Sequence, residues 1–572
     1  MLRTLQVGRQ RFRPANQMAY AGATRPLARR KFLIMPLFED SHRGEVLRLL
    51  ALVGLCLFLF CFGLHSRVLW DVDEGMHAVM TKNILLNGDW VTPTFNGENF
   101  YDKPILFNWL GALCFLLFGF NEFAARLPAT IFGTAGVLVT YYLGRKMFGP
   151  GIGFLGGVVL AVSAEYILLS RVVVHDIALT SFTTLALCFF YFGLVDEERR
   201  RRYFLLFWVA AGFAVLAKGP LGLVLPGLVI GVFLLSTRRL SLIKDMQIGW
   251  GFLILLAVAG PWYIAISLRN PDYLRYFILE KNLGSFSSSN THHAGPIYFY
   301  FRALSFGLLP WVTFVPLATI GAIRNRDRGP ADAVLFLLIW AGSIFAFFSL
   351  ATAKLESYIL PIFPAVALLL ALYWYDALAD PSPARRKGLL WSWSPLVGLM
   401  VAAVLYLWLV PPTSLQAKAG LDPPRVYGFI WTVAAFVILV FVLLWIKKSA
   451  AAMVTIVVLT ATAMALFNLV LAPPVGPYRA TKELGLRLDQ RLPPGDKYVF
   501  YQRIRDSAMF YTDREAIVLE RPSDMQELLQ SKNREYCILD ERRLKELDGL
   551  KDLFFILDQD GNKYLISNRP DP

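Results

Sequence analysis

Three carboxylates lie close together in one polar segment of a largely apolar chain. Asp71, Asp73 and Glu74 fall within four consecutive positions. If a helix begins near Glu74, Asp71 and Asp73 lie at its positive amino end, where they stay ionised and can bind or orient a polar substrate. The alternative, that Asp73 is only a helix cap and Asp71 a solvated loop charge, stays open at this point.

Single lysines stand against apolar runs further along the chain. Lys103, Lys218 and Lys354 each occupy such a position. A lone lysine there is commonly an anchor whose stem lies in lipid and whose charge reaches water. An anionic phosphate at the membrane surface would explain all three together, because it needs several cationic partners in one pocket.

The remaining candidates for chemistry are one aspartate and a few histidines. Asp176 precedes an apolar run and is either a helix cap or a second site carboxylate. His77, His175, His292 and His293 show no spacing that is diagnostic of a metal site, so we interpret them as scattered surface histidines. His292 and His293 are the weak candidates if a divalent metal binds, and no cofactor is predicted. The sequence has no phosphate-cradling glycine loop, nucleophile elbow or zinc-protease helix, so nucleotide-driven chemistry is unsupported.

The elements that must position these residues are membrane-spanning helices. Of 572 residues, 56% are hydrophobic and 17% are charged, a composition unlike that of a soluble globule. Apolar runs of about 17 to 25 residues are long enough to cross a hydrocarbon core of roughly 30 Å. We predict thirteen spans, at approximately 46–65, 122–144, 151–170, 177–195, 203–217, 220–236, 247–268, 300–322, 333–350, 357–375, 389–410, 427–446 and 451–472.

The placement of charge indicates the topology of these spans. The net charge of +15 would suggest a nucleic acid partner in a soluble protein, but here the basic residues concentrate in alternate short links between spans. This alternation is the positive-inside pattern. It predicts a cytoplasmic amino terminus, an external carboxyl terminus, long external loops at 66–121 and 269–299, and no nucleic acid partner. The basic links are Arg145-Lys146, Arg199 to Arg202, Arg238-Arg239, Arg324/Arg326/Arg328, Arg385 to Lys387 and Lys447-Lys448.

The two ends of the chain differ from the middle. Residues 1–45 are basic and lack the arrangement of a removable signal, so we predict a disordered cytoplasmic tail, within which Met35 is an alternative start. Residues 473–572 mix charge with short apolar runs, which predicts a small external α/β domain. Its expected strands are 498–501, 516–519, 536–539, 553–557 and 564–566, with a helix from Ser523. The predicted fold is therefore an all-α polytopic membrane domain, 46–472, followed by this α/β domain.

Several stretches of the sequence resemble the ArnT family of aminoarabinose transferases. This family belongs to the lipid-carrier-dependent glycosyltransferases of the GT-C class, as do the protein O-mannosyltransferases. The thirteen spans and the external carboxyl-terminal domain are also similar to that architecture. The matching stretches are Asp73-Glu74-Gly75-Met76-His77-Ala78, Gly88-Asp89-Trp90-Val91-Thr92-Pro93, Tyr101-Asp102-Lys103-Pro104, Asn121 to Pro128, Ala217-Lys218-Gly219-Pro220 and Lys354 with Tyr358-Ile359-Leu360-Pro361.

The resemblance implies a role for individual residues. Asp73 would be the essential loop carboxylate, with Glu74 beside it and Asp176 as a further site carboxylate. Where relatives often have an arginine, this chain has Ser285, so we expect Lys281 to supply that charge. The donor phosphate would be held by Tyr101, Lys103, Lys218, Lys281 and Tyr358, and Asp71, Asp102, Glu280 and Lys354 are further candidates.

The resemblance also implies an activity. The chain would be a monomeric enzyme of the bacterial inner membrane, with its site and carboxyl-terminal domain in the periplasm. It would move a sugar, such as 4-amino-4-deoxy-L-arabinose, from a polyprenyl-phosphate donor to lipid A or another glycan or protein acceptor. The lysines would stabilise the charge on the departing phosphate, and Asp73 would be the general base for a hydroxyl acceptor.

Two other functions remain as alternatives. One is a protein O-mannosyltransferase or another transferase of the same class, which would differ in its substrates. The other is a transporter or flippase for anionic lipid-linked sugars, which should bury charge at mid-membrane and often shows repeats of broken helices. The charges here are predicted at one face, and we find no repeat in the sequence.

Overall fold

Long helices make up most of the structure, a computed structural model that describes residues 40–284, 294–380, 382–409, 422–493 and 495–571. Most of the predicted tail 1–45 and part of the loop 269–299 lie outside these ranges. From the amino end the elements are α1 (His42–Cys56), η2 (Leu57–Cys61), α2 (Asp73–Asn87), β1 (Thr94–Phe95), β2 (Glu98–Asn99), α3 (Leu106–Phe118), α4 (Glu122–Phe148), α5 (Pro150–Ala161), α6 (Ala164–Leu169), α7 (Asp176–Val195), α8 (Arg200–Lys218), α9 (Leu221–Ser236), η3 (Leu240–Lys244), α10 (Ile248–Arg269), α11 (Tyr273–Arg275) and η4 (Tyr276–Gly284). They continue with α13 (Phe299–Gly307), η5 (Val312–Phe314), α14 (Val315–Arg324), η6 (Pro330–Asp332), α15 (Ala333–Leu350), η7 (Glu356–Ile362), α16 (Phe363–Ala379), α17 (Pro383–Leu409), α19 (Pro423–Trp445), α20 (Ser449–Leu466), η8 (Phe467–Leu471) and α21 (Ala472–Arg479).

Nine helices in the described ranges are long and apolar enough to cross a membrane, or ten if the bent pair α13 and η5–α14 counts as one span. This makes the chain a multi-pass membrane protein. Each of the thirteen predicted spans coincides with a helix or a helix pair. Three of them, at 151–170, 203–217 and 220–236, correspond to α5 with α6, α8 and α9, which are not among these ten.

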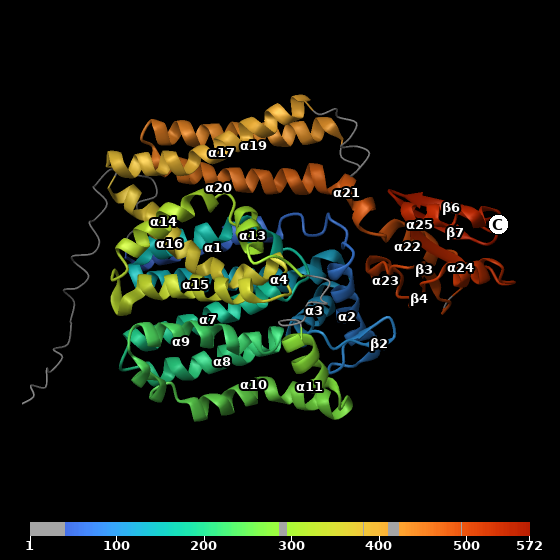
Figure 1. Ribbon diagram of the computed structural model, residues 1–572, viewed down its shortest axis with the longest axis horizontal. Coiled ribbons are helices and arrows are strands. Elements are labelled where there is room, and N and C mark those ends of the chain that lie inside the picture. Colours follow the sequence, from blue (N-terminus) through green and yellow to red (C-terminus); the bar gives the residue numbers. More distant parts are fainter. Residues whose placement is uncertain (1–39, 285–293, 381, 410–421, 494, 572) are drawn as a thin grey trace, which may run out of the picture.

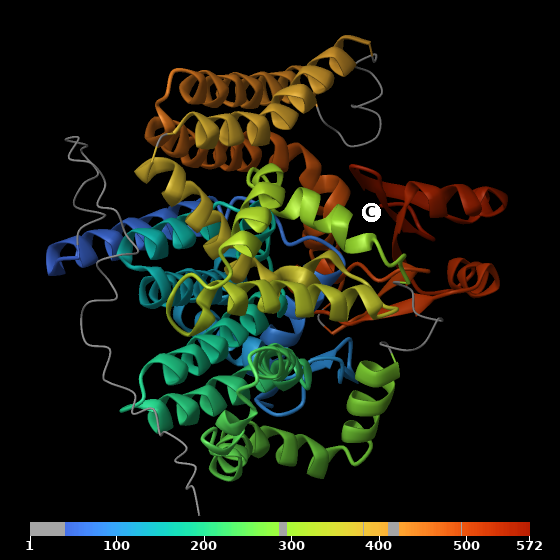
Figure 2. The same ribbon diagram turned by 60° about the vertical axis from the view of Figure 1, so that its left-hand side comes forward.

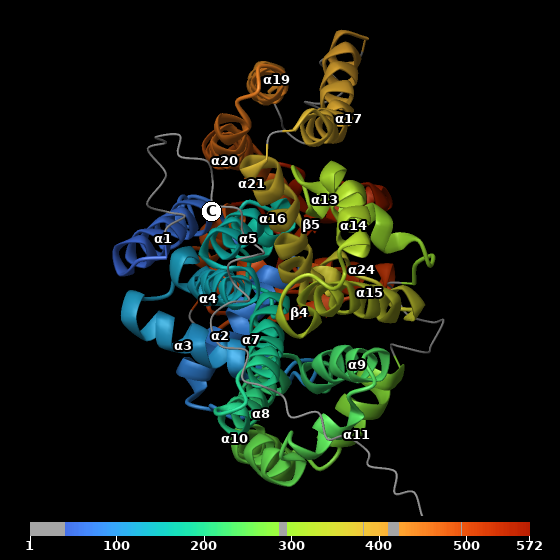
Figure 3. The ribbon, with the colours of Figure 1, turned by 90° about the vertical axis from the view of Figure 1, so that its left-hand side faces the viewer.

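The bundle centres on α4, α5, α7 and α16, which pack against one another. Glycines allow α4 and α5 to approach closely: a Cβ built on Gly153 would lie 2.5 Å from the carbonyl oxygen of Tyr141. The helices α17, α19 and α20 lie to one side of this centre (Figure 3), and many of their large apolar side chains are exposed. Such surfaces suit contact with lipid.

The predicted first external loop, 66–121, folds into a small structure of its own at one end of the bundle. The helix α2 begins at Asp73, one residue before the predicted start, and the turn-rich stretch after it forms the β1–β2 hairpin. The helix α3 has 13 residues, too few to span a bilayer. Its face at Leu113, Leu116 and Leu117 is exposed, which suits a position in the membrane interface.

The carboxyl-terminal α/β domain lies beside this loop, at the same end of the bundle (Figures 1 and 2). Its five-stranded sheet has the order β4-β3-β5-β7-β6, with parallel β4, β3 and β5 and antiparallel β7 and β6. All five predicted strands and the predicted helix are present. The elements are α22 (Lys482–Asp489), β3 (Tyr498–Tyr501), α23 (Asp506–Thr512), β4 (Ala516–Leu519), α24 (Pro522–Leu529), β5 (Tyr536–Asp540), α25 (Glu541–Glu546), η9 (Asp548–Leu553), β6 (Phe555–Asp560) and β7 (Lys563–Ser567).

The predicted domain boundary at residue 473 falls within helical structure. Pro473 and Pro474 stand in the first turn of α21, where a proline costs no helical hydrogen bond, and the helical path from α20 runs on to Arg479. The double proline is therefore part of a helix.

Candidate active site

A cavity of about 430 Å³ gathers most of the predicted phosphate ligands at the loop end of the bundle. Lys103 comes from the loop between α2 and α3, Lys218 from the end of α8, Lys281 from η4 and Tyr358 from η7. These residues are separated by up to 255 positions in the sequence, yet they line one space. Apart from Asp102 and Asn282, the rest of the lining is apolar and includes Leu221, Val224, Ile278, Phe347 and Phe348.

Two of the three cavity lysines are already paired with carboxylates. Lys218 forms an ion pair with Asp176, the first residue of α7, and Lys281 forms one with Asp102. The Lys218 ammonium also lies 4.3 Å from the centre of the Tyr358 ring, within the range of a cation–π interaction. Asp176 thus holds the Lys218 side chain at the cavity rather than capping α7 as its N-cap residue, which is His175.

Lys103 is the cavity lysine without an ion pair among the described residues. Burial lowers its pKa to about 8, and the neighbouring charge of Lys218 contributes in the same direction, while Asp176 and Asp102 oppose the shift. A desolvated ammonium that lacks a direct counter-ion has much to gain from an anionic ligand. Lys103 is therefore the cation most available to a phosphate.

The aromatic and acidic residues near the cavity either belong to η4 or contact it. The Tyr101 hydroxyl donates to Oδ1 of Asn270 at 2.6 Å, and the Tyr276 hydroxyl donates to Oδ1 of Asp102 at 2.6 Å. Tyr101 also contacts the Tyr276 ring edge-on, so it supports η4 rather than lining the cavity. Glu280 is exposed on η4.

The two adjacent carboxylates of the acidic segment have different surroundings. Glu74 is buried, and Arg126 donates to both of its oxygens at 2.7 and 2.8 Å. Burial alone would raise the pKa of Glu74, but Arg126 outweighs burial and the net pKa is lowered. Asp73 is exposed, and its side chain has no hydrogen bond or ion pair within the described parts of the chain. Of the two, Asp73 is the carboxylate that can meet a substrate.

Two further candidates have structural contacts instead. Asp71 accepts hydrogen bonds from the Ser507 amide at 2.8 Å and the Thr481 hydroxyl at 3.2 Å, both in the α/β domain. It is therefore not a solvated loop charge. The Lys354 ammonium donates to three backbone carbonyls just beyond and within the end of α15, at 2.6 to 3.3 Å. Its three N–H groups are used in this way, which leaves none for a phosphate.

The interpretation of His77 and His175 as surface histidines is wrong. His77 is 5% exposed and His175 is 2% exposed, and their ring centres lie 4.6 Å apart. A signal was available, because His77 follows Asp73 by four positions and so lies on the same face of a helix that starts at Asp73. Buried Arg126 was also missed, since an arginine inside a span gives no indication of which carboxylate it binds.

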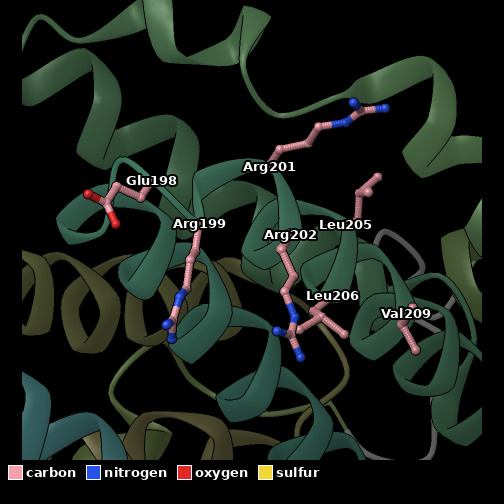
Figure 4. A pocket seen from close by; sticks show the side chains of 7 residues that line it. All are labelled: Glu198, Arg199, Arg201, Arg202, Leu205, Leu206 and Val209. Carbon is pink, nitrogen blue, oxygen red and sulfur yellow. The ribbon is translucent and has the colours of Figure 1, made fainter.

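The described residues contain no group of three or more histidine, cysteine, aspartate or glutamate side chains that could hold a metal ion. His292, His293 and Ser285 lie outside the described residues. A second cavity, of about 530 Å³, lies at the opposite end of α8 and is lined by Arg199, Arg201 and Arg202 together with Leu205 and Leu206 (Figure 4). It contains no residue of the site.

Comparison with known proteins gives a consistent picture. Residues 102–264 match a family model described as dolichyl-phosphate-mannose-protein mannosyltransferase. The chain is 30% identical over 368 residues to an undecaprenyl phosphate-alpha-4-amino-4-deoxy-L-arabinose arabinosyl transferase of Edwardsiella ictaluri, covering 63% of this chain and 65% of that protein. It is 31% identical over 371 residues to the protein of the same name from Aeromonas salmonicida, covering 62% and 65%. The match thus spans about 65% of the length of these relatives.

Solved structures show the same fold. ArnT from Cupriavidus metallidurans bound to undecaprenyl phosphate superposes with a TM-score of 0.77 at 21% identity, covering 93% of this chain and 100% of that one. The oligosaccharyltransferase of Archaeoglobus fulgidus gives a TM-score of 0.51 at 14% identity, covering 88% and 70%. The chain is therefore ArnT-like in its sequence, and it has the fold of ArnT.

Proposed function

We propose that this protein is an integral-membrane glycosyltransferase that takes its sugar from a polyprenyl-phosphate donor. The observation that carries the proposal is the convergence of Lys103, Lys218 and Lys281 on one cavity whose other walls are largely apolar. A polyprenyl phosphate has the matching chemistry, an anionic head on a hydrocarbon chain. The names of the relatives favour 4-amino-4-deoxy-L-arabinose as the sugar, and lipid A is the acceptor that we propose.

The lysines would act on the leaving group. As the bond between sugar and phosphate breaks, negative charge builds on the polyprenyl phosphate, and fixed ammonium groups in a desolvated site stabilise it. Lys103 would contact the phosphate directly, because Lys218 and Lys281 already share their charge with Asp176 and Asp102. Tyr358 would confine the phosphate from the side of η7.

Asp73 would act on the acceptor. It lies exposed at the positive amino end of α2, where the helix dipole favours a negative charge. With a hydroxyl acceptor it would remove the proton as general base. With a phosphate acceptor the nucleophile is already ionised, and Asp73 would orient the sugar or pair with an amine on it. Glu74, fixed by Arg126, would hold the loop that presents Asp73.

A transferase of the same class with a protein acceptor is the second candidate. The observation that favours it is the match of residues 102–264 to the mannosyltransferase family model. In either case we propose a monomer in the bacterial inner membrane, with a cytoplasmic amino terminus and with the site and the α/β domain in the periplasm. Mass spectrometry of lipid A and surface glycans from cells with and without the gene separates the two acceptors.

The test of the activity uses the purified protein with a labelled sugar on undecaprenyl phosphate. With a hydroxyl acceptor, we expect Asp73→Asn to lower kcat by at least about 100-fold, a common effect of losing a general acid–base group. We expect Lys103→Gln to weaken donor binding as well as turnover. Glu527→Gln, which changes an exposed carboxylate on α24, is the matched control. Full activity of Asp73→Asn in normally folded protein would contradict the role of that carboxylate.

A further inference from the structure

Two buried imidazoles are close in sequence to the two carboxylates of the proposed site. His77 is on α2, one turn after Asp73, and His175 immediately precedes Asp176 at the start of α7. The rings meet at 64°, with centres 4.6 Å apart. Phe100 and Phe107 contact the pair from its other sides.

Three of the four ring nitrogens of this pair have no hydrogen-bond partner among the described residues. Nδ1 of His77 and both ring nitrogens of His175 are buried without a hydrogen bond to any described residue. A buried polar atom normally has a partner, because leaving it unpaired forfeits the hydrogen bond that water would supply. An unpaired group in a site therefore points to a ligand that completes it.

The pair is neutral, which limits what that ligand can be. Burial lowers the pKa of His77 to about 3, and the charge of Lys103 lowers it further, while Asp176 and Asp102 oppose the shift. Burial and the neighbouring His77 lower the pKa of His175 in the same way. A neutral imidazole offers one donor and one acceptor. This suits a hydroxyl or amine better than a phosphate, for which the lysines are the stronger ligands.

The position of His77 identifies the part of the donor that it would meet. Residues four apart on a helix share a face, so His77 lies beneath Asp73. The charges that act on it are those of Lys103, Asp176 and Asp102. With the phosphate on the lysines and the acceptor at Asp73, the transferred sugar must lie between these groups.

We propose that His77 hydrogen-bonds a hydroxyl or amine of the transferred sugar and thereby selects the donor, an inference that rests on the proposed function. His175 is a positioning residue, because its ring packs against His77 and fixes the orientation of that imidazole. The pair would then distinguish a glycosylated carrier from the bare carrier.

Equilibrium binding of two probes tests this proposal. The probes are undecaprenyl phosphate alone and undecaprenyl phosphate carrying 4-amino-4-deoxy-L-arabinose, each titrated into the full-length protein. We expect His77→Phe, which keeps an aromatic ring but removes both nitrogens, to weaken binding of the sugar-bearing probe by about tenfold, the equivalent of about one hydrogen bond. Binding of bare undecaprenyl phosphate should stay unchanged. His65→Gln, at an exposed histidine, is the control and should change neither value.

The other outcomes are informative as well. Equal weakening of both probes by His77→Phe would overturn the proposal, because it would mark a structural or phosphate-binding role, and so would no weakening of either. Lys103→Gln should weaken both probes. If the wild-type protein binds neither probe, the proposed function is contradicted. If His77→Phe loses only its preference for the sugar-bearing probe, the role of His77 in binding the sugar is supported. A series of donors, in each of which one sugar hydroxyl or the amine is replaced by hydrogen, would identify the contacted group. The replacement that weakens binding to the wild-type protein but not to His77→Phe marks the group that His77 contacts.

Discussion

The charge state of Lys103 links the site to pH. The Lys103 side chain is a charged ammonium below its lowered pKa of about 8, and it loses that proton above this pH. We therefore expect kcat/KM for the lipid donor to fall as the pH rises through about 8. Lys103→Arg should remove this fall, because an arginine stays charged throughout that range. A pH–rate profile of both proteins, from about pH 6 to about pH 10, is the measurement.

Thermal stability provides the control for that profile. The folded-state pKa of Lys103 lies below the ordinary value of 10.5. The unfolded chain thus binds more protons between the two values, and this residue's contribution to stability increases with pH there. Activity and this contribution should change in opposite directions above about pH 8. If the melting temperature fell together with kcat/KM and Lys103→Arg did not prevent it, unfolding rather than lysine titration would explain the profile.

The sequence alone could identify some of the site residues. Asp73, Lys103 and Lys218 stand out because charged residues at the ends of apolar runs are rare and costly. It could not separate Lys218 from Lys354, since both stand at such ends. Only packing shows that Lys354 donates to three backbone carbonyls, whereas Lys218 faces the cavity. Neighbours such as Asp73 and Glu74 are likewise alike in sequence, and only the location of Arg126 separates them.

At the scale of elements, the contact between α2 and α23 connects the loop to the α/β domain. A Cβ built on Gly75 would lie 2.7 Å from the Ser507 amide nitrogen and 2.9 Å from the Asp506 carbonyl carbon. These are backbone atoms, so the helix α23 would have to move. We expect Gly75→Ala to destabilise the protein by about 1 to 3 kcal/mol and to lower activity, although no site group is removed. Differential scanning fluorimetry and the transfer assay measure both effects.

The matched control is Gly54→Ala in α1, where a Cβ would meet nothing within 4 Å. There the alanine should be neutral or slightly stabilising, because alanine has the higher helix propensity. A Gly75→Ala protein as stable and active as Gly54→Ala would show that the close packing of α2 on α23 is unimportant to the site.

Element boundaries were predictable where the pattern was strong. The strands β3 and β4 were predicted to the residue, because short apolar runs are bounded there by polar and turn residues. The helix α21 was not predictable, because two prolines usually end a helix, whereas here they stand in its first turn. The helical structure of η4 in the loop 269–299 was also missed, since a single π-type helix has no clear sequence period.

At the scale of the whole molecule, the predicted topology can be tested with single cysteines. The described native cysteines are unpaired and lie in or beside apolar elements, which leaves introduced ones easy to distinguish. We expect a membrane-impermeant maleimide to label Glu527→Cys in intact spheroplasts and Arg326→Cys only after permeabilisation. Arg326 is exposed in the link after α14. Labelling of Arg326→Cys in intact spheroplasts would contradict the predicted orientation.

The association of the two parts of the molecule could not be read from the sequence. Asn96 pairs with both backbone groups of Ala516, at 2.8 and 2.9 Å, and Lys82 donates to the Phe510 carbonyl at 2.9 Å. These partners are more than 400 positions apart. A side chain that binds backbone groups, as Asn96 does, has no complementary residue type to search for, so no sequence pattern reveals this contact.

The helix α8 is not among the ten candidate spans of the described residues, but its length is close to the thickness of a bilayer. Its 19 residues cover about 28 Å at about 1.5 Å per residue, close to the thickness of the hydrocarbon core. The arginines Arg200 to Arg202 mark one end and Lys218 the other. With the arginines at the headgroups of one leaflet, Lys218 reaches the headgroups of the opposite leaflet. On the proposed function, the phosphate of the carrier lipid would therefore reach the cavity that Lys218 lines without changing its depth in the membrane.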